Sequence, residues 1–78
     1  MKALRNHHYR ARIEVGIFKR ALCNEGVILD KLVDAGFDQI TVRKYGAGKY
    51  EAEAVWLHPD SEDVELPDEI THVEDLGP

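Results

Sequence analysis

The sequence has little cysteine, no long apolar run and, after residue 50, no Lys or Arg. Cys23 is the only cysteine among the 78 residues, which excludes an internal disulfide and a zinc site built from several cysteines. No apolar run approaches the roughly 20 residues that span a bilayer, and the first eight residues lack the apolar core of a signal peptide. We therefore expect one small soluble, cytoplasmic domain that does not engage a membrane.

Side chains that could support catalysis or hold a metal are present, but their spacing is wrong. The four histidines include no helical H-x-x-x-H pair, and His58 with Asp60 lacks the third ligand that a catalytic zinc site needs. Cys23 precedes an expected helix, yet a nucleophilic thiol also needs a base beside it. We expect no enzyme activity, no metal and no other cofactor.

The glycine-rich stretch Gly46-Ala47-Gly48-Lys49 looks like part of a phosphate-binding loop, but its spacing fails. A P-loop would need glycine at position 43, which is Arg43, and Ser or Thr at position 50, which is Tyr50. The stretch is better explained as a hairpin turn. Its tip carries a candidate second contact, which comprises Lys44, Tyr45, Lys49 and Tyr50. Basic and aromatic residues can bind nucleic acid. Such residues also commonly protect the edge of a hairpin from pairing with another strand, and we favour this second interpretation.

Hydrophobic periodicity predicts three strands and one helix. Alternation predicts strands over Tyr9–Phe18, Asp38–Tyr45 and Lys49–Leu57. Asn24 is a suitable N-cap for a helix that ends before Gly36, which is placed to adopt a left-handed conformation. The helix carries a four-residue apolar stripe, which comprises Ile28, Leu29, Leu32 and Val33.

The register of the last two strands follows from their side chains. A three-residue loop, Gly46-Ala47-Gly48, pairs Val42 with Ala52 on one face and Arg43 with Glu51 on the other, whereas a two-residue loop would mix the faces. Such loops favour a positive φ at their third residue, which Gly48 can adopt.

These elements predict an α+β fold, in which one helix packs on a three-stranded antiparallel sheet. The chain order is β-α-β-β and the spatial order of the strands is 1-3-2. Ile70–Val73 is a candidate for a short fourth strand. We divide the chain into an N-terminal arm (1–8), a core domain (9–57) and an acidic C-terminal segment (58–78) that packs on the core or extends from it.

The sheet face away from the helix would show Phe18, Val55 and Leu57. That face is too apolar to be wholly exposed, so we expect the C-terminal segment or a second copy of the chain to cover it. A homodimer through this face is therefore one interpretation.

Charge is distributed very unevenly along the chain. Residues 1–50 hold all ten Lys and Arg with five acids, a net charge of +5, while residues 51–78 hold the other ten acids and no Lys or Arg, a net charge of −10. The acidic part could serve as a solubility tail, as a surface for a basic partner, or as a clamp on the basic first half. The candidate partner-binding residues are Asp60, Glu62, Asp63, Glu65, Asp68, Glu69, Glu74 and Asp75.

Two classes of function follow. The first is a non-catalytic protein-binding module that engages a basic protein or nucleoprotein complex and imitates nucleic acid; the second is a structural or assembly subunit. Direct nucleic-acid binding by the basic first half comes third. In size and charge the chain is similar to phage- or plasmid-encoded inhibitors of host machinery, such as those of CRISPR effector complexes and RNA polymerase, and this likeness implies a viral or mobile-element inhibitor.

Overall fold

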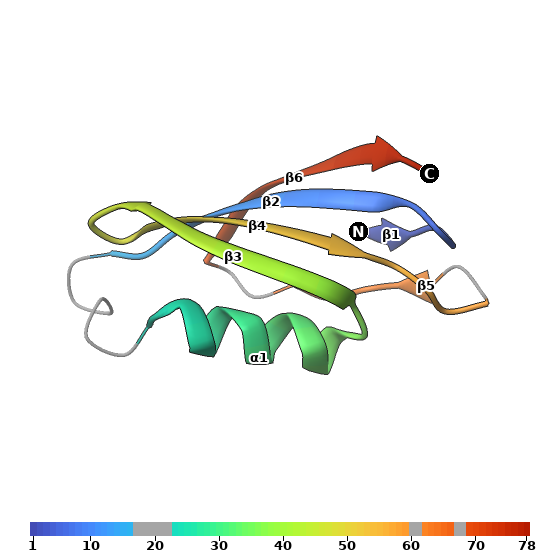
Figure 1. Cartoon of the computed structure of the whole chain (residues 1–78), viewed down its shortest axis with the longest axis horizontal. Helices are drawn as coiled ribbons and strands as arrows, with labels where there is room; N and C mark the ends of the chain where they lie inside the picture. Colours follow the sequence, from blue (N-terminus) through green and yellow to red (C-terminus); the bar gives the residue numbers. More distant parts are fainter. Residues whose placement is uncertain (17–22, 60–61, 67–68) are drawn as a thin grey trace.

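The computed structural model of the chain describes residues 1–16, 23–59, 62–66 and 69–78. One layer is a four-stranded sheet of β2 (His8–Glu14), β3 (Asp38–Gly46), β4 (Lys49–Val55) and β6 (Ile70–Gly77), in the order β3-β4-β2-β6. The helix α1 (Glu25–Ala35) lies on one face of this sheet (Figure 1). Two short strands, β1 (Lys2–Ala3) and β5 (Glu62–Asp63), pair with each other near one end of the molecule. The fold is therefore α+β.

The sheet has four strands, so the prediction of three was wrong, although the predicted core order of antiparallel neighbours is present as β3-β4-β2. The fourth strand, β6, begins at Ile70 as expected but continues to Gly77 and pairs antiparallel with β2. This pairing gives the second edge of β2 a partner and places Val73 against the core. The sequence signal was weak because Glu74 and Asp75 interrupt the apolar alternation. The predicted division at residues 8/9 and 57/58 stays a prediction.

The helix ends are as predicted. The side chain of Asn24 accepts a hydrogen bond from the backbone N–H of Val27 at 3.0 Å, and Gly36 has a φ of 109°. The backbone N–H groups of Gly36 and Phe37 donate to carbonyls of the last turn. These contacts satisfy groups that a helix end leaves unpaired.

The predicted apolar stripe is too wide. Ile28 and Leu32 are buried, but Leu29 is 38% exposed and Val33 is 55% exposed. Residues four positions apart lie along one side of a helix. The core therefore covers the side with Ile28 and Leu32 and leaves the neighbouring side with Leu29 and Val33 in solvent. Sequence periodicity indicates which helix residues are apolar, but it does not indicate how far the sheet extends beneath the helix.

The hairpin confirms the predicted register and corrects the turn. Arg43 lies opposite Glu51 and Val42 opposite Ala52, as expected. The turn itself closes one residue later, with Gly46 opposite Lys49 and an irregularity between residues 44 and 46. A bulge of this kind changes the loop length without moving the side chains beyond it to the other face. Gly48 has a φ of 66°, the positive value predicted for it.

Other boundaries shift slightly. The first long strand, β2, runs from His8 to Glu14, whereas the prediction was Tyr9–Phe18. Residues 17 and 18 of the predicted range lie outside the described part of the chain. The third predicted strand ends at Val55 rather than Leu57. Trp56 still belongs to the fold, because it is 1% exposed and its ring packs edge-on against Phe37 at a centroid distance of 5.2 Å.

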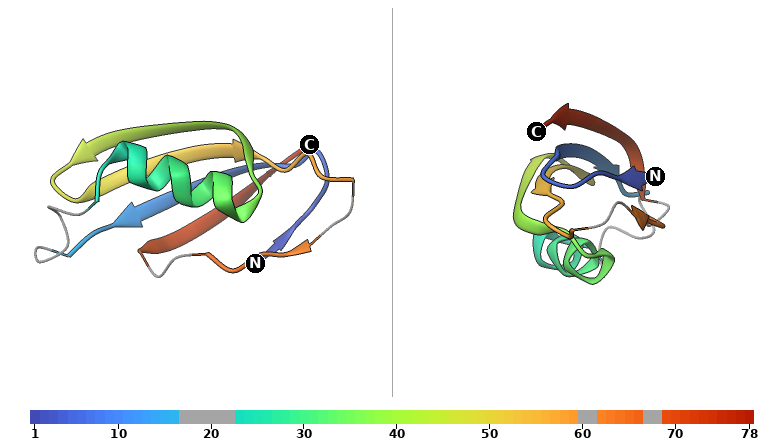
Figure 2. Two further views of the ribbon diagram at one scale, coloured as in Figure 1. Left: turned by 90° about the horizontal axis from the view of Figure 1, so that it is seen from below. Right: turned by 90° about the vertical axis from the view of Figure 1, so that its right-hand side faces the viewer.

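The N-terminus is integrated into the same core. The Met1 amino group donates to the Val64 carbonyl at 3.0 Å, and Val64 N–H donates back to Met1 at 2.7 Å. Ala3 is fully buried, and the backbone N–H of Leu4 donates to the Tyr9 hydroxyl at 2.8 Å. The first residues therefore tie the start of the acidic segment to the sheet, and Figure 2 shows β1 and β5 side by side.

Candidate acidic contact surface

The structure describes six of the eight acidic residues predicted to bind a partner. Asp60 and Asp68 lie outside the described residues. The other six do not form one surface. They separate into a group beside cationic side chains of earlier elements, Glu69, Glu74 and Asp75, which we call the held group, and a group in and just after β5, Glu62, Asp63 and Glu65.

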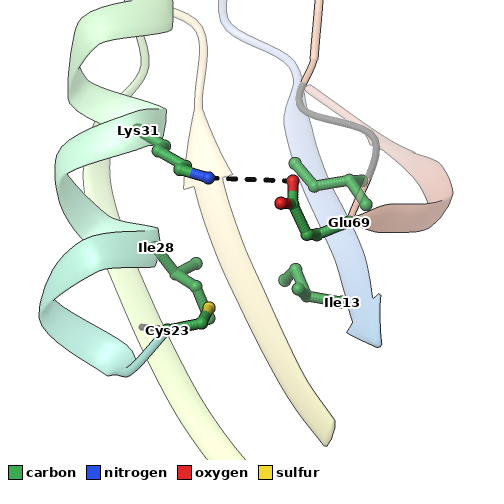
Figure 3. A pocket seen from close by; sticks show the side chains of 6 residues that line it. Ile13, Cys23, Ile28, Lys31 and Glu69 are labelled. Atoms are coloured by element: carbon green, nitrogen blue, oxygen red, sulfur yellow. Dashed lines mark ion pairs between the residues drawn. The ribbon is translucent and has the colours of Figure 1, made fainter. Parts of the chain in front are cut away.

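Glu69 and Asp75 belong to the held group. Glu69 lies 3.7 Å from the Lys31 ammonium on α1, and Figure 3 shows the two side chains pointing toward each other. The imidazole Nδ1 of His7 lies 3.0 Å from both carboxylate oxygens of Asp75. Each pair joins the acidic segment to an earlier part of the chain.

The local hydrogen bonds of Asp75 also change its acidity. The backbone N–H of Gly77 donates to Asp75 Oδ1 at 2.8 Å. This bond, followed by the one with His7, lowers the pKa of Asp75 below its ordinary value of 3.8, because both stabilise the carboxylate form. The carboxylate thus fastens the end of β6 to the start of β2.

Glu74 faces a basic neighbour across the sheet. It lies opposite Arg10 in the β2–β6 register. Arg10 donates to Glu53 at 3.0 Å and lies 3.6 Å from Glu51. The hydrogen bond with Glu53, together with the nearby carboxylates, raises the pKa of Arg10. Acids from β4 and β6 therefore surround Arg10 on the sheet face away from the helix.

The remaining three acids, Glu62, Asp63 and Glu65, are exposed, and we call them the acidic end. The Asp63 side chain is 92% exposed, and its carboxylate lies 3.6 Å from the Met1 amino group. Such an exposed ion pair contributes little to stability. Glu65 lines an open hollow of about 410 Å³, together with Asp34 and Lys31 on α1 and the aliphatic surface of Ala35 and Leu66.

The candidate second contact at the hairpin is brought together only in part. Lys44, Tyr45 and Lys49 are exposed, and Tyr45 is 49% exposed. Tyr50 is only 4% exposed, and its hydroxyl donates to the Cys23 carbonyl at 3.3 Å. Tyr50 therefore packs in the core and does not offer its ring to a ligand.

The predicted oligomer face is also divided. Val55 is 7% exposed, so the single chain already buries it, whereas Leu57 is 43% exposed. Phe18 lies outside the described residues. A dimer through this face stays a prediction that rests on Leu57 alone among the described residues.

The cavity beside Cys23 has little room for a ligand. Ile13, Cys23, Ile28, Lys31, Glu69 and Ile70 line a cavity of about 10 Å³ (Figure 3), which is space for about one water molecule. Within the described ranges, no three His, Cys, Asp or Glu side chains are grouped so that they could hold a metal ion. The same ranges contain no helix long and apolar enough to cross a membrane.

Comparisons of the chain with known protein families, with curated proteins and with solved structures found no match.

Two contacts that organise the acidic segment were not predicted individually. His7 and Asp75 are separated by 68 positions in the chain. Lys31 lies on the helix α1, and its partner Glu69 lies in the loop before β6. The unequal charge of the two halves indicated that they attract each other. It could not say which acids meet a cation, because that depends on the position of β6.

Proposed function

We propose that the protein is a non-catalytic binding module that docks its acidic end onto a basic site of a protein or nucleoprotein complex. By occupying a site that otherwise holds nucleic acid, it acts as an inhibitor, which is the role of the mobile-element proteins that it is similar to in size and charge. It does so in the cytoplasm.

A single observation carries the proposal. Glu62, Asp63 and Glu65 are exposed within four residues of one another, and the described part of the acidic segment contains no Lys or Arg. Of the three, Asp63 forms an ion pair with the Met1 amino group, at 3.6 Å. Carboxylates left in solvent without strong partners retain their charge for an incoming cation.

The structure around the acidic end supports a docking role in two further ways. Backbone pairing of β5 with β1 fixes Glu62 and Asp63 opposite Ala3 and Lys2, so a partner need not order that part of the chain on binding, which lowers the cost of association. The hollow beside Glu65 is also lined by Asp34, Leu66 and Lys31, and the Lys31 ammonium already lies 3.7 Å from Glu69. A lysine or arginine side chain has an aliphatic stem and a charged head that match such a surface.

Equilibrium binding of a fluorescent arginine-rich peptide tests the proposal. Changing Glu62, Asp63 and Glu65 together to Ser should weaken binding by about tenfold or more, since three attractions are lost. The matched control changes three exposed acids elsewhere, Glu14→Ser, Glu25→Ser and Asp30→Ser, with the same change in net charge.

The control should bind nearly as well as the unchanged chain. Equal losses in the two triple variants would show that the peptide senses only net charge, and the acidic end would then have no particular role. A melting temperature that falls only in the first variant, with binding intact, would instead make the acidic end part of the intramolecular clamp.

A further inference from the structure

We draw no further inference here: the strongest candidate, the exposed apolar side of α1 at Leu29 and Val33, carries nothing because nothing in the structure shows what covers it.

Discussion

The end of α1 gives the sharpest prediction for stability. Gly36 has a φ of 109°, and a Cβ atom added there would lie 3.0 Å and 3.1 Å from two ring carbons of Trp56. Trp56 is 1% exposed and packs against Phe37, so its ring has little freedom to move. Gly36→Ala therefore adds backbone strain of about 1 kcal/mol to overpacking of about 1–3 kcal/mol. We expect unfolding to become easier by about 2–4 kcal/mol.

Chemical denaturation followed by Trp56 fluorescence measures this change, and the same loss should lower the melting temperature by roughly 10 °C or more for a domain of this size. Gly16→Ala is the matched control: an added Cβ at Gly16 would meet nothing within 4 Å, and the backbone there is not left-handed. The control should change stability by less than about 0.5 kcal/mol. A Gly36→Ala protein as stable as the control would refute both the strain and the crowding.

Two further predictions concern the turn and the end of β6. Gly48→Ala should destabilise by about 1 kcal/mol or more, because φ is 66° at Gly48, whereas Lys49→Ala should have almost no effect in the same denaturation assay. The lowered pKa of Asp75 means that its stabilisation is present above pH 3.8 and is lost as the pH falls through the lower folded value. Asp75→Asn should therefore reduce the acid-dependent loss of stability in titrations below pH 5. If the acid transition is unchanged, the Asp75 carboxylate does not contribute to the stability that is lost in acid.

Local patterns predicted the parts of the fold that depend on neighbours in the chain. Asn24 and Gly36 defined α1 because caps act through adjacent backbone groups. The pairing of Arg43 with Glu51 followed from charge and from the two-residue period of a strand. The sheet width and the exposed Val33 could not be predicted, since both depend on where α1 and β6 lie on the sheet.

The candidate site shows the same division. Its charge was evident from the sequence, because the charge of the two halves differs in sign. The separation of Asp75 and Glu69 from the exposed Glu62 and Glu65 required the structure, since tertiary contacts with His7 and Lys31 decide it. Tyr50 illustrates the converse error, because an aromatic residue beside a basic turn can equally be part of the core.

The association rate of the chain with the arginine-rich peptide, measured from about 0.05 to 0.5 M salt, tests the central claim most directly. Over this range the screening length falls from above 10 Å to only a few Å. The account predicts a steep fall of the rate with salt, and a clearly shallower fall when Glu62, Asp63 and Glu65 are Ser. A rate that is independent of salt, or one that falls equally steeply in both proteins, would contradict a contact made through the acidic end.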